Sequence, residues 1–289
     1  MRVLVTGATG FVGRHLLPRL VSEHDVIALV RRPPASLLGA AAALVADLND
    51  PGLDSVLPGG VDVVVHLAQG YLAFPEHAGE IFAINAGSTQ RLADWGRKTG
   101  VRRFLLASSG SVYSPASRPL REDDPTGPLA FHPATKLIAE QLLGFYEDAM
   151  DIVRLRLFAP YGPGQTDRMI PRLIATIAEG RPVRLSRGGE PRLNPIHIDD
   201  LVDVISQAVA GAGAPVVNIA GPRSVSVAEI AEVIGTTLGR TPVFEEHDVD
   251  PPGDLIADTA RMHGVFRIGS MVDPADGVAR ATNALVARA

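Results

Sequence analysis

Two side chains one helical turn apart could carry proton chemistry in this sequence. His132 and Lys136 stand four positions apart in the stretch FHPATKL, within a segment whose pattern predicts a helix over 131–149. Residues with this spacing share one face of a helix. An imidazole has a pKa of about 6.5, and the lysine charge should lower it because a like charge disfavours the protonated ring. We therefore expect His132 to be mostly neutral at neutral pH, able to accept a proton or donate one hydrogen bond.

A glycine-rich turn near the start of the chain could bind phosphate groups. Its three glycines have GxxGxxG spacing in TGATGFVG, between an apolar run at 2–6 and a predicted helix over 11–22. Glycine allows a tight turn and a close approach of the backbone to a pyrophosphate, which the free N–H groups at a helix start favour. This strand–turn–helix context favours a dinucleotide site over a tight turn without a ligand. The predicted cofactor contacts of this turn are Gly7, Thr9, Gly10, Phe11, Val12 and Gly13.

Two arginines at the end of the second predicted strand bear on the choice of dinucleotide. An acidic residue at this place binds a ribose 2′-OH, whereas an arginine accommodates a 2′-phosphate. The sequence has Arg31 and Arg32 here and no acid, which favours NADP over NAD unless both are solvated surface charges. Asp47 and Leu48, after the third predicted strand, are placed to meet the adenine. The alternative for Asp47 is that it caps a following turn.

These residues can form one site only in a fold that brings the ends of several strands together. The sequence pattern of the first half of the chain predicts such a fold. Short apolar strands alternate with helical segments, which is typical of a doubly wound α/β fold with a parallel sheet. The predicted strands are 2–6, 25–30, 42–47, 61–68, 102–109 and 152–158, and the predicted helices are 11–22, 78–99 and 131–149.

The sequence pattern changes in the second half of the chain, where proline and glycine become frequent and long apolar runs typical of buried strands are absent. We predict a Rossmann dinucleotide-binding domain over 1–158, with 195–221 returning to it. The segments 159–194 and 222–289 are predicted to form a smaller C-terminal substrate lobe.

The composition excludes several classes of function. The 289 residues are 46% hydrophobic and 20% charged with a net charge of −5, so a full core is expected, and nucleic acid and membranes are not expected partners. The absence of Cys excludes disulfides and a thiol nucleophile, and the eight His show no ligand spacing, so no metal is expected. The chain opens into a strand pattern without a signal peptide, so the expected location is the cytoplasm.

Several motifs together resemble the extended short-chain dehydrogenase/reductase family, which includes NAD(P)-dependent sugar-nucleotide epimerases, dehydratases and reductases. TGATGFVG is similar to the cofactor turn of that family, HLAQ at 66–69 to its fourth-strand motif, and SSGSVYS at 108–114 to its catalytic-serine strand end. INAGST, LRLFAPYGPGQ, NPIHIDDL and PPGDLIADTAR resemble further family segments along nearly the whole chain. The resemblance implies a Rossmann fold, an NAD(P) cofactor and a hydroxyl or keto substrate, such as a sugar derivative or a secondary-metabolite intermediate.

The resemblance also implies roles for particular residues. The family uses a Tyr that exchanges a proton with the substrate oxygen, a Lys four residues later that binds the nicotinamide ribose, and a Ser that bonds to the same oxygen. Ser109 and Lys136 match two of these positions, and His132 stands where the Tyr is expected. Further implied cofactor contacts are Leu67, Ala68, Gln69, Ser108 and Lys136. The implied substrate contacts are Ser109, Ser111, Tyr161 and Arg192.

The exchange of Tyr for His leaves three interpretations open. His132 could act as the acid or base of an adapted oxidoreductase or epimerase/dehydratase site. The protein could instead bind cofactor without catalysis, as a pseudoenzyme or partner module, since losing a proton relay costs about 10²–10⁴ in rate. A different phenol could also take over, from Tyr71, Tyr113 or Tyr161.

Two further departures from the family bear on the substrate and leave its size open. The family has Asn where this chain has Ala159, and it often has an Arg that binds a nucleotide diphosphate where this chain has Pro251. Fewer cationic partners weaken the binding of a diphosphate, so a smaller or less charged compound is as strong an expectation as a nucleotide sugar. The resemblance also implies a homodimer, in which the helices 78–99 and 131–149 pair between subunits.

Overall fold

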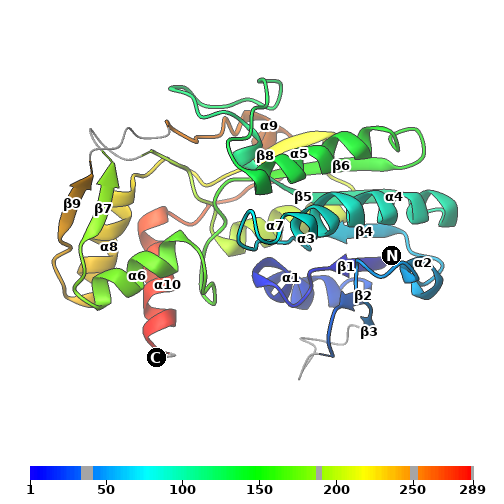
Figure 1. Cartoon of the computed structure of the whole chain (residues 1–289), viewed down its shortest axis with the longest axis horizontal. Helices are drawn as coiled ribbons and strands as arrows, with labels where there is room; N and C mark the ends of the chain where they lie inside the picture. Colours follow the sequence, from blue (N-terminus) through cyan, green and yellow to red (C-terminus); the bar gives the residue numbers. More distant parts are fainter. Residues whose placement is uncertain (34–41, 187–190, 248–252, 288–289) are drawn as a thin grey trace.

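The computed structural model describes residues 1–33, 42–186, 191–247 and 253–287, and its main layer is a seven-stranded parallel sheet (Figure 1). The strand order is β3-β2-β1-β4-β5-β6-β8, so the direction of winding reverses between β1 and β4. The strands are β1 (Arg2–Thr6), β2 (Asp25–Val30), β3 (Ala42–Val45), β4 (Val63–His66), β5 (Arg103–Ser109), β6 (Asp151–Leu157) and β8 (Val216–Ile219). The predicted α/β Rossmann fold is confirmed.

Helices cover both faces of this sheet, which explains why the central strands are apolar on both sides. One buried cluster includes side chains of α1 (Phe11–Val21), α7 (Ile198–Val209) and α9 (Ala260–Val265). The cluster on the other face includes side chains of α2 (Leu53–Val56), α4 (Ser88–Thr99) and α5 (Phe131–Gly144). The parallel register pairs Thr6 with His66 and His66 with Leu106, so β1, β4 and β5 end at the same edge of the sheet.

The predicted helix over 78–99 is divided into three parts. A short helix, α3 (Ala78–Phe82), leads into a π-helical turn, η1 (Ala83–Gly87), which continues as α4. Asn85 lies in this turn and bonds outside its own helix: its Oδ1 accepts the Gly70 N–H at 2.8 Å, and its Nδ2 donates to Thr135 Oγ1 at 2.8 Å. Such turns are frequent at functional sites, and this one ties the loop after β4 to α5.

The helix that carries His132 is shorter than predicted. It ends at Gly144 instead of residue 149, and residues 145–149 form turns. Glycine is among the poorest helix formers, so it ends the helix although the apolar pattern continues beyond it.

The smaller part of the chain packs around its own apolar core, at the left of Figure 1. Its elements are α6 (Met169–Ala178), β7 (Val183–Ser186), α8 (Val227–Leu238), β9 (Phe244–His247) and α10 (Pro274–Val286). β7 and β9 pair in parallel, and side chains of α6, α8 and α10 form most of the core. In the described part of the chain, no helix is long and apolar enough to cross a bilayer.

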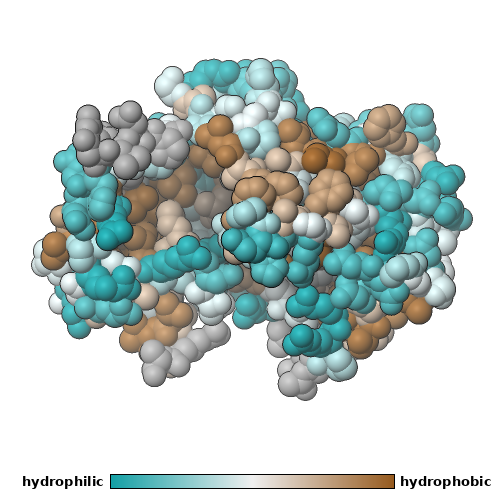
Figure 2. Space-filling model, viewed as in Figure 1, coloured by the Kyte–Doolittle hydropathy of each residue, from teal (hydrophilic) through white to brown (hydrophobic). Residues whose placement is uncertain are grey.

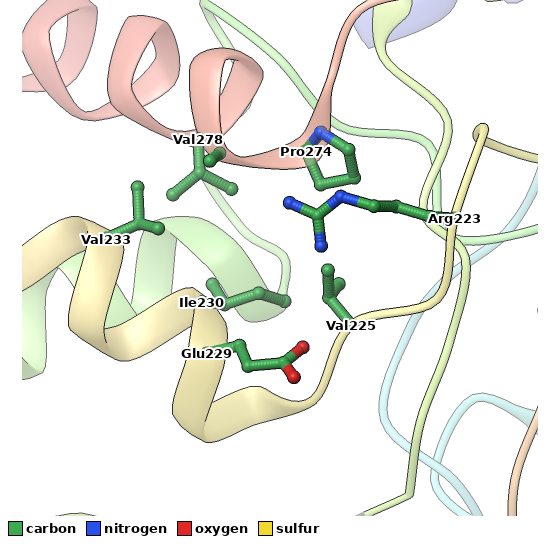
Figure 3. A pocket seen from close by; sticks show the side chains of 8 residues that line it. Arg223, Val225, Glu229, Ile230, Val233, Pro274 and Val278 are labelled. Carbon is green, nitrogen blue, oxygen red and sulfur yellow. The ribbon is translucent and has the colours of Figure 1, made fainter.

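A small cavity lies between α8 and α10 in this part (Figure 3). Its volume of about 30 Å³ leaves room for a water molecule but not for a substrate. Arg223 beside it donates two hydrogen bonds to Asp273, at 2.7 and 2.9 Å. This ion pair therefore joins the segment before α8 to the start of α10.

A buried polar network ties α5 to the strands beneath it. The Arg156 guanidinium donates to Glu140 at 2.7 Å from Nη2 and at 3.1 Å from Nε, and Ser108 Oγ also donates to that carboxylate. Arg156 Nη1 donates to the Tyr113 hydroxyl at 2.6 Å, and this hydroxyl donates in turn to Asn218 Oδ1 at 2.9 Å. A buried ion pair is tolerated when its remaining hydrogen-bonding groups are satisfied in this way.

Removing one partner of this pair should destabilise the fold strongly. Arg156→Met leaves the Glu140 carboxylate buried without its cation, and the free energy of unfolding should fall by about 3–5 kcal/mol, as measured by urea unfolding. The double variant Arg156→Met with Glu140→Leu removes both charges and should recover most of this loss. A single-variant loss below about 1 kcal/mol, the range of exposed pairs, would show that the network does not support the fold.

Candidate active site

The candidate site lies at the carboxyl edge of the sheet, where the strand order reverses between β1 and β4. Loops that leave neighbouring strands in opposite directions at such a point form a crevice, and ligands of open α/β sheets bind there. The glycine turn follows β1, residues 67–71 follow β4, and Ser108 and Ser109 end β5. The topology therefore brings together most of the residues that the sequence singled out.

The glycine turn packs so closely that side chains would not fit. Gly7 has a φ of 66°, and a Cβ on it would lie 2.6 Å from Ala68 N. A Cβ on Gly13 would lie 2.4 Å from Gly7 O, and the Gly10 N–H donates to the same oxygen at 2.9 Å. No side chain caps the start of α1, and its first turn contains no acidic residue, so its amide groups can receive an anion. Thr9 and Gly10 are exposed, and Phe11 and Val12 are half-buried beside them.

The predicted cofactor contacts at the far end of the crevice are open to solvent. Arg31 and Arg32 are exposed at the end of β2, and neither has an ion pair with any residue that the structure describes. Asp47 Oδ1 accepts the Asn49 N–H at 2.9 Å, so this residue stabilises the turn that follows it. The Leu48 carbonyl accepts a hydrogen bond from Arg91 Nη1 at 3.2 Å, which fixes the loop to α4.

His66 is a structural residue below the loop after β4. Its Nδ1 bonds to Thr6 Oγ1 at 2.7 Å and its Nε2 to Ser88 Oγ at 3.2 Å. Burial, with a smaller contribution from the Lys136 charge, lowers the pKa of His66 to about 3. The Thr6 hydroxyl in turn accepts the Ala68 N–H at 3.2 Å. The neutral ring therefore holds the start of the loop, where Leu67 and Ala68 are half-buried and Gln69 is exposed.

The two serines at the end of β5 have different surroundings. Ser108 is buried and donates to Glu140, so it supports the network under α5. Ser109 is half-buried, and its Oγ accepts the Ser111 N–H at 3.1 Å. Because that bond uses the oxygen as an acceptor, the Ser109 hydroxyl proton remains free to bond to a substrate oxygen.

Lys136 is fully enclosed by the protein, with 1% of its surface exposed. Burial lowers the pKa of Lys136 to about 8, and the nearby Glu140 carboxylate opposes that shift. At neutral pH the ammonium therefore still carries most of its charge, and it stands one helical turn from position 132. An enclosed cation beside a cofactor crevice fits the ribose-binding role that was predicted for it.

His132 is half-buried and has the feature expected of a working imidazole. Its Nε2 is buried and has no hydrogen-bond partner within the described part of the chain. The pKa of His132 is lowered to about 4, mainly by burial and to a smaller extent by the charges of Lys136 and Arg168. The ring is thus neutral at neutral pH, as the sequence predicted, and its buried Nε2 is left without a partner among the described residues.

The three tyrosines named as replacements occupy different environments. Tyr113 is fully buried, and burial raises its pKa while Arg156 and Asn218 hold its hydroxyl. Tyr161 is also fully buried, with burial raising its pKa, and it packs against His197 at 5.4 Å between ring centroids. Tyr71 is 56% exposed and lies edge-on to His132, with 4.9 Å between ring centroids. Only Tyr71 of the three has a ring contact with the imidazole in the part of the chain that is described.

The other predicted substrate contacts lie around this centre. Ser111 is half-buried in the turn after β5, whereas Tyr161 is enclosed under α10, where a Cβ on Gly277 would lie 2.2 Å from its hydroxyl. Arg192 donates to both carboxylate oxygens of Glu229, at 3.2 Å from Nη2, so its charge is already paired. Pro251 lies outside the described residues.

The backbone conformation of Ala159 gives a physical reason for the Asn that the family has at this position. It has a φ of 41°, in the left-handed region, which Asn adopts more readily than Ala. The residue at this position therefore bears on the backbone geometry.

Four residues of the site were not predicted from the sequence: Asn85, Glu140, Arg156 and Arg168. A signal was present for Glu140, which is a carboxylate one turn beyond Lys136 and the one acidic residue of that helix. No local pattern marked Arg168, which becomes part of the site only because α6 begins beside the loop after β4. A cavity of about 340 Å³ lies there, and its lining includes Tyr71, Arg168 and Arg172.

Comparison with known proteins agrees with this geometry. The sequence profile of the NAD dependent epimerase/dehydratase family matches residues 3–220. A UDP-glucose 4-epimerase from Mycolicibacterium smegmatis is 30% identical over 97% of this chain and 97% of its own. An uncharacterized UDP-glucose epimerase of Bacillus subtilis, YtcB, is 30% identical over 96% of each chain. The solved structure of MoeE5 in complex with UDP-glucuronic acid and NAD superimposes with a TM-score of 0.88 at 30% identity, covering 100% of both chains.

The fold defines a dinucleotide-dependent enzyme of the Rossmann type, and the candidate reactive groups lie at the end of β5 and at the start of α5. More specifically, the chain belongs to the NAD dependent epimerase/dehydratase family. The predicted membership of the extended short-chain dehydrogenase/reductase family is confirmed, as is an NAD-type cofactor.

The close packing of the glycine turn can be tested directly. Gly13→Ala places a methyl group against the Gly7 carbonyl, so the turn must open and dinucleotide affinity should fall by about tenfold or more. Fluorescence titration with NADH and NADPH measures this change, and circular dichroism checks the fold. The control is Gly59→Ala, where a Cβ would have no neighbour within 4 Å. Equal affinity in the two variants would show that the turn does not hold the cofactor.

Proposed function

We propose that the chain is an NAD(P)-dependent enzyme that removes hydrogen from a hydroxyl-bearing carbon, with His132 as the base. The observation that carries this proposal is the buried and unpartnered Nε2 of a neutral imidazole, one turn from the enclosed Lys136. A neutral imidazole has a ring nitrogen that can accept a proton, whereas only the protonated ring, which is scarce at neutral pH, could act as the acid. The site is therefore suited to begin with oxidation of an alcohol.

The residues around the reacting carbon divide the work as follows. The Ser109 hydroxyl donates a hydrogen bond to the oxygen of the substrate hydroxyl group. His132 Nε2 takes the proton of this substrate hydroxyl group. Lys136 binds the nicotinamide ribose, while the glycine turn binds the pyrophosphate. When bound, the oxidised cofactor supplies the acceptor for the hydride that leaves the same carbon, so that an alcohol becomes a carbonyl.

A sugar nucleotide or a smaller sugar derivative is the proposed substrate class. UDP-sugars are named with several relatives and with MoeE5. The pairing of Arg192 with Glu229 leaves less free positive charge for a diphosphate. For that reason a less charged hydroxyl or keto compound stays an alternative. The reaction is then an oxidation on its own or the first step of an epimerisation or dehydration.

NADP is proposed as the preferred form of the cofactor. Arg31 and Arg32 are exposed, neither has an ion pair with a described residue, and no acid accompanies them at the end of β2, which is the pattern that accommodates a 2′-phosphate. NAD is the form bound in MoeE5, so NAD use by this chain is the alternative that the experiment below decides.

A homodimer is proposed to form through the surface of α3, α4 and α5. Phe82 on α3 and Phe145 at the end of α5 are exposed, at 44% and 86%, and Figure 2 shows hydrophobic surface over this part of the molecule. The location in the cytoplasm and the division into 1–158 with 195–221, against 159–194 with 222–289, stay predictions. A cofactor-binding pseudoenzyme is the second candidate, because His132 replaces the phenol.

The role of His132 separates these candidates. His132→Ala should lower the rate of substrate oxidation by about 10²–10⁴, whereas His132→Tyr should keep or raise it. The wild-type rate should fall as the pH drops through about 4, because protonation removes the base. Steady-state kinetics over a panel of UDP-sugars and simple sugars, with the exposed His263→Ala as control, measures both effects. Turnover that is unchanged in both variants would remove His132 from the chemistry, and absence of turnover with any substrate would favour the pseudoenzyme.

The cofactor preference has its own test. Replacing both Arg31 and Arg32 by Ala should weaken NADPH binding by about tenfold or more, because each charged hydrogen bond contributes about 1.5–3 kcal/mol, and NADH binding should change little. Isothermal titration with both cofactors measures the difference, and the exposed Arg19→Ala serves as control. An equal loss for the two cofactors would contradict the assignment of a 2′-phosphate site.

A further inference from the structure

Tyr71 is held between two groups that come from different parts of the chain. On one side it lies edge-on to His132, with 4.9 Å between ring centroids. On the other, the guanidinium carbon of Arg168 lies 3.8 Å from the centre of the phenol ring, within the range of a cation–π contact. Tyr71 belongs to the loop after β4, His132 to the first turn of α5, and Arg168 is the residue before α6. The three side chains therefore bridge the crevice from the main sheet layer to the smaller part of the chain.

The backbone next to Tyr71 is fixed to the helix that carries His132. Asn85 Oδ1 accepts the Gly70 N–H at 2.8 Å, and Asn85 Nδ2 donates to Thr135 Oγ1 on α5. Phe74, three residues further along the loop, stacks on Phe131 with 4.7 Å between ring centroids. The position of the Tyr71 ring over the imidazole is thus set from both sides of the loop.

The exposure of Tyr71 argues against a purely structural role. A tyrosine with 56% of its surface exposed contributes little apolar burial to the core. The ring also lines the cavity of about 340 Å³ that continues along α6. A side chain of this kind shapes a site more than it stabilises a fold.

We propose that Tyr71 is a positioning residue for His132 and that Arg168 holds Tyr71 in place. The ring covers the imidazole, keeps water from it, and sets its orientation towards the reacting oxygen. This role rests on the proposed function, because it concerns how His132 accepts the substrate proton.

The charges that face the imidazole support this role. Lys136 comes from the same helix and Arg168 from the segment before α6, and both are positive. No carboxylate among the described residues contributes to the shift in the pKa of His132, whose largest cause is burial. Removing the covering ring should therefore raise the pKa of His132 towards its ordinary value, and removing the Arg168 charge should raise it as well.

The test is a proton NMR titration of the histidine ring signals in the full-length enzyme without substrate or cofactor. The His132 signal is assigned by its absence in His132→Gln. Tyr71→Ala should raise the midpoint of His132 by about one pH unit or more, towards about 6.5, and Arg168→Gln should raise it by a smaller amount. Tyr71→Phe is the matched control, because it keeps the covering ring, and its midpoint should equal that of the wild type.

Two results would overturn the proposal. One is a Tyr71→Ala midpoint equal to that of the wild type in a protein whose near-ultraviolet circular dichroism shows an intact fold. The other is a rise in Tyr71→Phe as large as in Tyr71→Ala, because the hydroxyl rather than the cover would then control the imidazole.

Kinetics completes the test. If Tyr71 positions the base, Tyr71→Ala should lower kcat more than it changes KM, move the acid limb of the rate profile upward with the NMR midpoint, and be rescued by Phe. If no variant and no wild-type enzyme turns over, the proposed function fails, while the titration still decides whether Tyr71 controls the imidazole. If the wild-type enzyme is active but the His132 midpoint is unchanged in Tyr71→Ala, the role of Tyr71 is overturned while the proposed function stands.

Discussion

The attachment of α5 to the strands beneath it is the constraint on which the site depends. His132, Lys136 and Glu140 follow one another at intervals of one helical turn, so a single helix face carries the imidazole, the ammonium and the carboxylate. Glu140 binds Arg156 of β6 and Ser108 of β5, which fixes the rotation and the height of the helix over the sheet. Because the same carboxylate acts on Lys136, the network that holds the helix also keeps its buried lysine charged.

The exchange of a phenol for an imidazole changes what this helix face can do. A phenol carries its proton at neutral pH and gives it up under the influence of the lysine. An imidazole in the same place is neutral, because burial and two neighbouring cations disfavour its protonated form. In the proposed reaction, this neutral ring takes a proton from a hydroxyl group. A carbonyl intermediate that needs a proton back must receive it from the imidazolium just formed, before the proton is lost to solvent.

Much of this architecture could be predicted from the sequence. The apolar runs before the glycine turn and at 61–68 and 102–109 marked strands buried on both faces, and all six predicted strands are in the observed sheet. The order of the strands and the seventh strand, β8, were not predicted. The neutral state of His132 was predicted from its spacing to Lys136, but its main cause is burial, with the lysine charge second. What could not be predicted depends on contacts between distant segments. The π-helical turn at Asn85 exists because its amide bonds to Gly70 and Thr135, and Arg168 approaches Tyr71 only through the placement of α6. The burial of Tyr113 and Tyr161 and the exposure of Tyr71 likewise depend on tertiary packing and were not predicted from the sequence.

A crystal structure with bound NADP⁺ and, separately, NAD⁺ tests most directly whether this helix face works on a dinucleotide. The predicted result has the pyrophosphate over the turn of Gly7, Gly10 and Gly13, with Lys136 Nζ in hydrogen-bond contact with the nicotinamide ribose. The imidazole of His132 would then face the space beside the nicotinamide ring. A dinucleotide bound elsewhere, or a ribose that lies out of reach of Lys136 Nζ, would contradict it.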